Sequence, residues 1–408
     1  MARSDAPPIA VFIIALLCTG CTGKIEQFMS ESTNQFAFDL YKAVQSHSEN
    51  VVVSPISLQI ILALMQQGAR NTTTAEIAGV LQHSVPNALL LEGYKSLITD
   101  LRSPVLKIVT KMFIEKTSKV FPDFQSIASN YFLSEIRGLD FKGNPEGSRV
   151  KINDWIEEHT YDKIKDLFPS GSLTSSTRLV LANAVYLKAL WKYPFDKMFT
   201  REGQFFISSD EVVTVQMMAL VQESLPHMYS IKLKSQMIEL PYKEEGYRMV
   251  IILPDDYNGL AALESKLTYT DFFTEASKLV RKEIDVFLPR FKVEESMDLA
   301  EILRKMGMPT AFSNSADFSR ISNEALKIDK VIQKALIEVT EEGTEVAIGS
   351  AFSVQLVSLP RRVRCNHPFI YMILKGNTIL FVGRLLRPMS QAEKTRIVFP
   401  EEPMSRFV

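Results

Sequence analysis

Side chains that commonly carry catalysis or bind metal ions are few in this sequence and are not arranged in known motifs. The five histidines contain no His-x-x-x-His pair, so we expect no metal site and no cofactor. There is no Gly-x-Ser-x-Gly turn to present a nucleophilic serine, and no glycine-rich phosphate loop. Because an enzyme needs a convergent set of reactive groups, the chain is not expected to be one, and a hydrolase has no nucleophile motif to support it.

A basic cluster near the C-terminus holds Arg361, Arg362 and Arg364. Such a cluster is solvated by default, although it would also suit a recognition surface or a cleavage site for a trypsin-like protease. His367 precedes a proline in an apolar stretch and is expected to be packed or to cap the backbone. Cys365 is expected to be a buried thiol rather than a redox switch.

The segment before this cluster combines features of a strand and of a loop. It contains no charged residue from Val346 to Pro360. Alternate residues share one face from Thr344 to Val354, which is the pattern of a half-buried strand. The pattern then ends in Ser358-Leu359-Pro360 and the arginines, which indicates an exposed loop. The residues alone leave both interpretations open.

Composition is that of an ordinary folded protein. The 408 residues are 46% hydrophobic and 23% charged, and the formal net charge is −1. A sizeable core is therefore available. The near-neutral net charge argues against a protein that binds a nucleic acid or an anionic membrane over its whole surface. No repeat or Gly/Ser-rich linker divides the chain, so we expect one domain.

The N-terminal segment, residues 1–23, has the pattern of a secretory signal peptide. An apolar run, Ile9–Leu17, is followed by small residues suited to cleavage near Gly23. We therefore expect a secreted, extracellular protein with its domain at residues 24–388 and a polar tail at 389–408. Cleavage would remove Cys18 and Cys21, which leaves no internal disulfide. Asn71 begins an Asn-Thr-Thr sequon and is a candidate glycosylation site.

Hydrophobic periodicity predicts helices in the first 170 residues and mainly strands afterwards. The helices are expected at Asn34–Ala43, Ser54–Gly68, within Thr74–Asp100, at Ser148–Asp166 and at Asp298–Met306. The strands are expected at Lys107–Ile114, Arg178–Leu187, within Gly203–Leu253, at Ile284–Val293 and in a hairpin, Ile370–Leu385, that turns at Gly376-Asn377. This order predicts an α+β fold with large antiparallel or mixed sheets.

Five motifs, in the same order along the chain, resemble signatures of the serpin family. They are VVVSPISL (Val51–Leu58), NAVYLKALWKYPFD (Asn183–Asp196), FSNSADFSRI (Phe312–Ile321), VRCNHPFIYMI (Val363–Ile373) and FVGRLLRP (Phe381–Pro388). The similarity extends from about Asn34 to Pro388 without large gaps. It implies a single domain with three β-sheets, about nine helices and an exposed reactive-centre loop, which would be the segment of mixed character described above.

The resemblance also implies a mechanism. In that family a serine protease attacks the loop and forms an acyl-enzyme, and the cut loop then inserts into the central sheet and distorts the protease before deacylation. Fifteen residues counted from Gly343 end at Val357, and counting back from the Asn366–Phe369 motif gives the same position, so the expected reactive bond is Val357–Ser358. The loop would be an exposed substrate for the protease before cleavage and a strand of the central sheet after it.

The residues around this bond suggest the kind of protease. Val357 would suit an elastase-like enzyme, with Leu356 as its neighbour on the substrate side and Leu359 beyond the bond. Other registers stay open: cleavage after Leu356 or Leu359 would suit chymotrypsin-like enzymes, and cleavage after Arg361 or Arg362 would suit trypsin-like ones.

The hinge before the loop resembles the inhibitory pattern in part. Its residues would be Glu341, Glu342, Gly343, Thr344, Glu345, Val346, Ala347 and Ile348. Gly343 permits a bend, since it lacks a Cβ atom, and Thr344 is small and uncharged. Val346 and Ile348 are bulkier than the residues usual in inhibitory hinges and would slow insertion. By analogy Glu341 pairs with Arg290, as a surface pair that adds little stability.

Two further regions of the family fold can be assigned by resemblance. The shutter would contain Ser54, Ser57, Asn183 and Gln333, and Trp191 would lie in the breach. Gln333 stands where many members carry a histidine. Its amide could still bridge Ser54 and Asn183 by hydrogen bonds.

The resemblance predicts a monomer whose partner is a serine protease. The rival hypothesis is a non-inhibitory member of the family that acts as a carrier, chaperone or storage protein. Activation by a glycosaminoglycan is not expected, because Lys95 is the only lysine or arginine within Thr74–Asp100.

Overall fold

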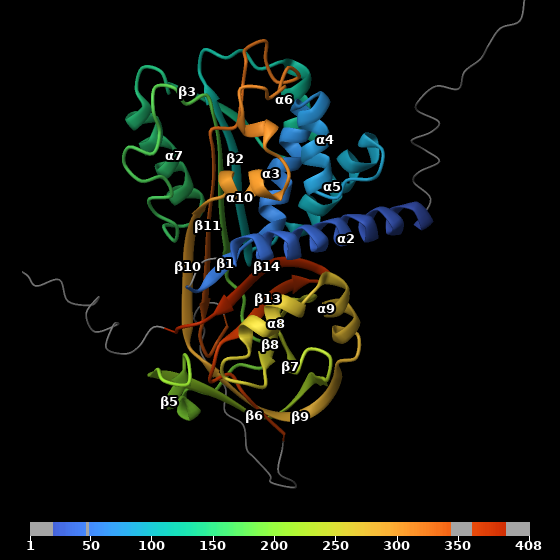
Figure 1. Ribbon diagram of the computed structural model, residues 1–408, viewed down its shortest axis with the longest axis vertical. Coiled ribbons are helices and arrows are strands. Elements are labelled where there is room, and N and C mark those ends of the chain that lie inside the picture. Colours follow the sequence, from blue (N-terminus) through green and yellow to red (C-terminus); the bar gives the residue numbers. More distant parts are fainter. Residues whose placement is uncertain (1–18, 46–48, 344–360, 389–408) are drawn as a thin grey trace, which may run out of the picture.

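The computed structural model describes residues 19–45, 49–343 and 361–388. These residues form two hydrogen-bonded sheets, one of five strands and one of nine, with nine α-helices packed around them (Figure 1). The α+β class with mixed sheets is therefore confirmed. The predicted reactive bond, residues 1–18 of the predicted signal segment and the C-terminal tail fall outside the described residues.

The five-stranded sheet has the order β10-β11-β4-β2-β3. Its strands are β10 (Phe291–Asp298), β11 (Lys330–Val339), β4 (Leu179–Leu187), β2 (Leu106–Glu115) and β3 (Ile136–Leu139). β4 and β11 are parallel neighbours, whereas β2 pairs with β4 and β10 with β11 in antiparallel fashion. Every residue of β4 is buried, because helices cover both faces of the sheet, as expected for a continuous apolar run.

Two layers of helices enclose this sheet. One face packs against α3 (Pro55–Gly68), a helix with all its residues buried, and the other packs against α7 (Pro145–His159). The remaining helices lie mainly around α3 and across the lower sheet (Figure 1). They are α2 (Thr19–Val44), α4 (Asn71–Val80), α5 (Asn87–Leu101), α6 (Pro122–Tyr131), α8 (Leu260–Lys266), α9 (Tyr269–Ala276) and α10 (Ala300–Met306), with short 3-10 turns η1 (Lys197–Phe199) and η2 (Thr310–Phe312).

The nine-stranded sheet has the order β1-β14-β13-β8-β7-β6-β9-β12, with β5 also paired to β6. Its strands are β1 (Val51–Val53), β5 (Arg201–Phe206), β6 (Val212–Ser230), β7 (Ser235–Pro241), β8 (Tyr247–Pro254), β9 (Val280–Pro289), β12 (Arg361–Arg364), β13 (Phe369–Lys375) and β14 (Thr378–Leu385). The long strand β6 changes register between Leu220 and Glu223, and it joins β5, β9 and β7. The family fold implies three sheets. In this structure the hydrogen bonds of β6 join the second and third of them into one nine-stranded sheet.

One predicted strand, Ile284–Val293, is divided in the structure. β9 ends at Pro289 and pairs with β6, whereas β10 begins at Phe291 and pairs with β11. The chain changes sheet at Arg290, whose backbone N–H donates to Gln216 over 2.8 Å. An apolar pattern shows that the segment is extended, but it does not show where the pairing partner changes.

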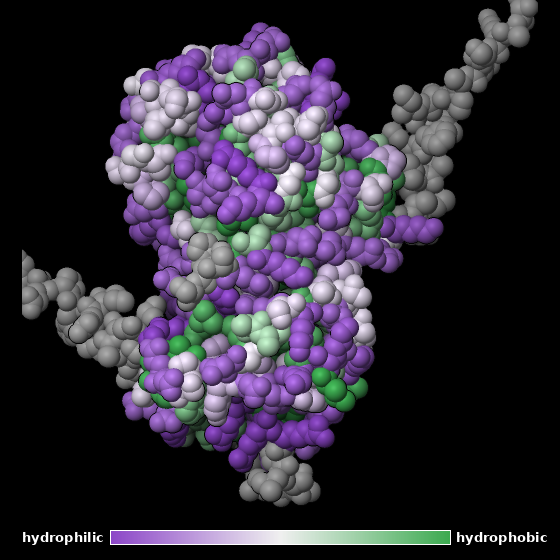
Figure 2. Space-filling view, viewed as in Figure 1, coloured by the Kyte–Doolittle hydropathy of each residue, from purple (hydrophilic) through white to green (hydrophobic). Residues whose placement is uncertain are grey.

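Hydrophilic residues cover α2 and much of the face in Figure 2, and hydrophobic residues appear between them in separate patches. Within the described ranges, no helix is long and apolar enough to cross a membrane.

Candidate functional site

The end of β11 leads into the hinge, whose last described residue is Gly343. Its amide donates to Thr340 over 3.3 Å, and the Thr340 amide donates back to Gly343 over 2.9 Å. Gly343 has φ +139°, and an added Cβ would lie 2.2 Å from the carbonyl oxygen of Ala189 and 2.5 Å from the Cα of Leu190. Both the conformation and the space therefore require glycine.

Glu341 fixes the hinge to the strands beside it. Arg290 Nε lies 2.6 Å and 2.7 Å from its two carboxylate oxygens, and the Thr200 hydroxyl donates to it over 2.6 Å. The Glu341 side chain is only 2% exposed, whereas that of Arg290 is 34% exposed. The predicted pairing with Arg290 is therefore confirmed, but its description as a surface pair is wrong. Burial alone would raise the pKa of Glu341, and the hydrogen bonds from Arg290 and Thr200 outweigh it and lower this pKa.

The lowered pKa predicts a pH-dependent contribution to stability. The charged pair contributes fully above the ordinary pKa of glutamate, about 4.3, and the contribution is lost as pH falls through the lower pKa of the folded state. Glu341→Gln is expected to lower the free energy of unfolding by about 1–3 kcal/mol at neutral pH. The difference from wild type should shrink below about pH 4. Urea unfolding across this range measures it, with the exposed Glu283→Gln as control; a difference independent of pH would contradict the ion-pair account.

The neighbouring breach region is held by backbone and aromatic contacts. Trp191 donates its amide to Glu342 over 2.9 Å and its indole N–H to Thr340 over 3.0 Å. Its ring stacks on Tyr242 with centroids 4.4 Å apart and planes 8° apart. Glu342 also accepts from Lys197 Nζ at 2.5 Å. Both backbone and side-chain contacts thus join the hinge to the segment that follows β4.

The shutter residues form one buried hydrogen-bond network between β11, β4 and the start of α3. Gln333 Nε2 lies 2.8 Å from Asn183 Oδ1, 2.9 Å from the Ser54 carbonyl oxygen and 3.2 Å from Ser57 Oγ. The Ser54 amide donates to Gln333 Oε1 over 2.9 Å. Gln333 and Asn183 are also register partners in the β4–β11 pair. The predicted bridging role of Gln333 is therefore confirmed.

The basic segment beyond the loop is a strand at the edge of the nine-stranded sheet. Arg361, Arg362 and Arg364 belong to β12, which pairs with β9, and all three side chains are exposed. His367 is buried and its Nε2 lies 2.7 Å from the carbonyl oxygen of Pro254, so it caps the backbone as predicted. Burial raises the pKa of the Cys365 thiol to about 12, which agrees with an inert buried cysteine.

The structure brings most of the predicted site residues that it describes into two groups along β11. Ser54, Ser57, Asn183 and Gln333 form the shutter network, and Trp191, Arg290, Glu341, Glu342 and Gly343 lie at the hinge. Asn71 lies apart from them, exposed at the start of α4, with its Nδ2 2.7 Å from Asp317. The other predicted residues lie outside the described ranges: Thr344, Glu345, Val346, Ala347, Ile348, Leu356, Val357, Ser358 and Leu359.

Four contacts of this site were not anticipated from the sequence. Thr200 and Lys197 hold the two hinge glutamates, Tyr242 supports Trp191, and the Thr110 hydroxyl accepts from Asn183 Nδ2 over 2.8 Å. No spacing or motif marks these residues, because each reaches the site through tertiary packing.

Comparisons with known proteins agree with this geometry. A family model described as "Serpin (serine protease inhibitor)" matches residues 31–388. Human Serpin B8 is 37% identical over 374 residues, covering 88% of this chain and 99% of that protein. The leukocyte elastase inhibitor of Bos taurus is 35% identical over 377 residues, covering 88% of this chain and 99% of that protein.

Solved structures give the same result. Serpin48 of the insect Tenebrio molitor has a TM-score of 0.82 and 32% identity, covering 89% of this chain and 99% of that chain. Human thyroxine-binding globulin complexed with thyroxine has a TM-score of 0.82 and 27% identity, covering 90% and 100%. The matched family is one of protease inhibitors rather than of catalytic enzymes. The chain belongs to the serpin family.

Proposed function

We propose that this chain is a secreted inhibitory serpin that traps a serine protease as an acyl-enzyme after cleavage at Val357–Ser358. The observation that carries the proposal is the hinge: Gly343 enters a close-fitting position beside Ala189 and Leu190, directly at the end of the β4–β11 pair. Glu341 and Glu342 anchor the residues just before it. This anchoring supports a mechanism in which the chain beyond Gly343 folds back along the sheet after cleavage.

The topology of the sheet favours such an insertion. β11 runs parallel to β4, so a strand that folds back from β11 and lies between them would be antiparallel to both. Antiparallel pairs can be joined by a short connection, whereas parallel pairs need a long crossover. Insertion must separate the register pairs from Lys330–Val180 to Leu336–Tyr186 and the Gln333–Asn183 hydrogen bond. This separation is the step that the shutter would control.

The choice of bond rests on position and on the chemistry of the side chain. Val357 presents a small apolar group, which suits the pocket of an elastase-like protease; one relative is named as a leukocyte elastase inhibitor. Cleavage after Arg361 or Arg362 is disfavoured, because both residues are already paired with Ile284 and Asp285 in β12 and β9. A chymotrypsin-like protease cutting after Leu356 or Leu359 is the next choice.

The test mixes the protein with elastase, chymotrypsin and trypsin, followed by denaturing electrophoresis and mass spectrometry of the released fragment. We expect a complex with elastase that survives heat and detergent, and a C-terminal fragment that begins at Ser358. Heat-inactivated protease serves as the control. Clean cleavage near Val357 without a complex would contradict the trap.

A non-inhibitory carrier is the alternative, and Val346 and Ile348 are the residues that favour it. Bulky β-branched groups would have to enter the sheet before deacylation, and a slow insertion releases the protease. Thyroxine-binding globulin, a structural neighbour, is complexed with a small ligand. The same gel separates the two functions, because a carrier is cut without forming a complex.

Secretion is supported by the N-terminal pattern and is compatible with the packing of α2. The family includes secreted members, and α2 starts at Thr19, before the expected cleavage near Gly23. Ile25, Phe28 and Met29 of α2 pack on the core and all follow the expected cleavage position, so cleavage would leave these contacts intact.

Expression in a secretory host tests this part. We expect secreted protein with an N-terminus near Lys24 and a glycan on Asn71, which is exposed. Treatment with an N-glycosidase should lower the mass of wild type but not that of Asn71→Gln. An intact N-terminus at Met1 on protein retained in the cells would contradict secretion.

A further inference from the structure

The corner where β6 turns into β7, beside the start of β9, exposes large apolar side chains. Ile231 is 84% exposed, Val280 is 54% exposed and Tyr229 is 47% exposed. Val280 lies opposite His227 in the β6–β9 pair, and Tyr229, two residues further along β6, faces the same side of the sheet. Figure 2 shows hydrophobic residues on the surface at the right-hand edge of the lower half of the molecule, near the start of β9 in Figure 1. Several exposed apolar residues in one place mark a candidate interaction surface.

The exposure of Ile231 follows from the way the turn is held. Leu233, two residues further on, is buried, and its amide donates to Ser230 Oγ over 3.1 Å. Lys232, between them, forms an ion pair with Asp271 of α9. The turn is therefore fixed to the body of the protein by these neighbours, and Ile231 is left in solvent because its neighbours occupy the contacts with the core and with α9.

Three cations border these apolar side chains. Lys234 is exposed and lies directly before Ser235, the first residue of β7. Burial lowers the pKa of His227, and the charges of Lys282 and Arg361 lower it further, so both cations lie near this buried ring. Within the described ranges, no carboxylate forms an ion pair with any of the three cations. The corner therefore combines exposed apolar groups with unpaired positive charge.

The carboxylates that contact this corner do not cancel its charge. Asp255 accepts from the Tyr229 hydroxyl over 2.6 Å. Two carboxylates of α9 form ion pairs with Lys232 and Lys278, which are additional to the three unpaired cations. Glu283 follows Lys282 in β9, and by the alternation of a strand its side chain lies on the opposite face. The net charge of the corner is positive, which favours an anionic partner.

We propose that this corner binds an anionic lipid surface. The three apolar side chains lie at the boundary between head groups and acyl chains, and the three cations contact the anionic head groups. Apolar side chains beside lysines and arginines are the combination that holds peripheral proteins on membranes. Tyr229 suits this boundary, because it carries an apolar ring with a polar hydroxyl. A sulfated polysaccharide would also attract the cations, but it offers no apolar phase for Ile231 to enter.

The near-neutral charge of the whole chain does not oppose this local contact. Exposed charges more than about 8 Å apart are largely screened from one another at physiological ionic strength, so the lipid surface interacts mainly with the charges of the corner itself. Binding at this corner does not depend on whether the chain inhibits a protease.

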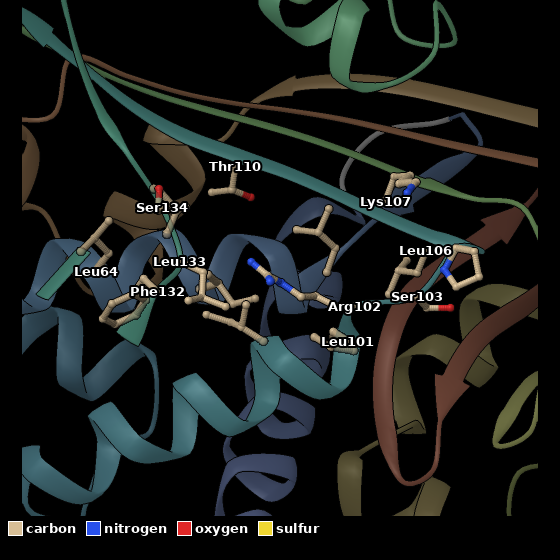
Figure 3. Close-up of a pocket in the computed structure, with 15 residues that line it drawn as sticks. Leu64, Leu101, Arg102, Ser103, Leu106, Lys107, Thr110, Phe132, Leu133 and Ser134 are labelled. Atoms are coloured by element: carbon tan, nitrogen blue, oxygen red, sulfur yellow. The ribbon is translucent and has the colours of Figure 1, made fainter. Parts of the chain in front are cut away.

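The corner also lies apart from the other sites of the molecule. The hinge and a cavity of about 400 Å³, lined by Leu64, Arg102 and Phe132 among others, both adjoin the five-stranded sheet (Figure 3). Ile231 and Val280 belong to the nine-stranded sheet and its turn. Substitutions at the corner are therefore expected to leave the hinge and the shutter unaltered.

The experiment is flotation of the full chain with vesicles in a density gradient. We expect tighter binding to vesicles of phosphatidylcholine and phosphatidylserine in equal parts than to vesicles of phosphatidylcholine alone. Added salt should reduce this preference, because it screens the cations. The apolar run Ile9–Leu17 is the same in both samples, so the difference between them reports on charge. Absence of any preference for phosphatidylserine overturns the proposal. Retention on heparin without that preference would assign the corner to a polyanion and would overturn it as well.

Variants locate the contact. Ile231→Ser is expected to weaken binding to the phosphatidylserine vesicles about tenfold or more, because it removes the most exposed apolar group. Met198→Ser, at a position that is 74% exposed outside the corner, should leave binding unaltered.

The charged part of the contact has its own pair of variants. Lys234→Gln should weaken binding about fivefold, whereas Lys305→Gln, at an exposed position of α10, should not change it. Thermal unfolding confirms that each variant folds. Unchanged binding in both Ile231→Ser and Lys234→Gln would show that the lipid contact lies elsewhere. A loss in Lys234→Gln alone would indicate a purely ionic contact and would equally overturn the proposal.

Discussion

Replacing Gly343 with alanine is expected to lower the free energy of unfolding by about 2–6 kcal/mol, combining about 1–3 for overpacking with about 1–3 for a strained backbone. The new methyl group would meet the Ala189 carbonyl oxygen at 2.2 Å and the Trp191 amide nitrogen at 2.8 Å. These are backbone atoms, so rotation of a side chain cannot relieve the overlap. The Trp191 amide is moreover engaged by Glu342. The overlap can be relieved only if the hinge backbone moves away from Ala189 and Trp191.

Gly171→Ala is the matched control for this prediction. Gly171 also has positive φ, +75°, but an added Cβ meets no atom within 4 Å. Its substitution therefore tests the backbone conformation alone and should cost only about 1–2 kcal/mol. Urea unfolding of both variants gives the comparison. Equal losses would mean that the close contact with Ala189 contributes nothing, and the hinge would then be less tightly held than its geometry indicates.

The sequence was informative about elements with strong local signals. α3 has Ser54 as its N-cap and ends at Gly68, in agreement with the predicted helix Ser54–Gly68, and β4 coincides closely with the predicted strand Arg178–Leu187. The β13–β14 hairpin turns at Gly376, whose φ is +54°. α7 was placed less well, because it ends at His159; Tyr161 and Asp162 then have positive φ, which periodicity does not reveal. Local rules succeed where a turn or cap residue marks the boundary.

In the candidate site, too, some contacts could be predicted from the sequence and others depend on tertiary packing. Motif resemblance placed Gln333, Asn183 and Ser54 in one region, and the structure brings them into hydrogen-bond contact. The burial of Glu341 could not be read from its neighbours, because it depends on Arg290 and Thr200, which are distant in sequence. An acidic pair before a glycine looks solvated in the sequence, and only tertiary structure shows that its first member is enclosed.

Gln333→Leu is expected to lower the free energy of unfolding by about 3–5 kcal/mol, because it leaves the buried Ser54 amide without a partner, at about 1–3, and removes the buried hydrogen bonds donated by Gln333 Nε2, at about 0.5–1.5 each. The groups affected are the amide and carbonyl of Ser54 and the Oδ1 of Asn183. Asn183 Oδ1 still accepts from Ser57 over 2.8 Å, which limits the loss. Urea unfolding measures the effect, and Gln204→Leu, at an exposed position of β5, is the control for the change in polarity.

Gln333→His separates the loss of hydrogen bonds from the loss of this particular side chain. Neutral histidine offers one donor and one acceptor, whereas the Gln333 amide accepts from Ser54 and donates toward both Ser54 and Asn183. Gln333→His should therefore be less destabilised than Gln333→Leu and more destabilised than wild type. If opening of the β4–β11 pair controls loop insertion, protease-complex formation should be fastest in the leucine variant. A leucine variant as stable as wild type would show that this network does not hold the two strands together.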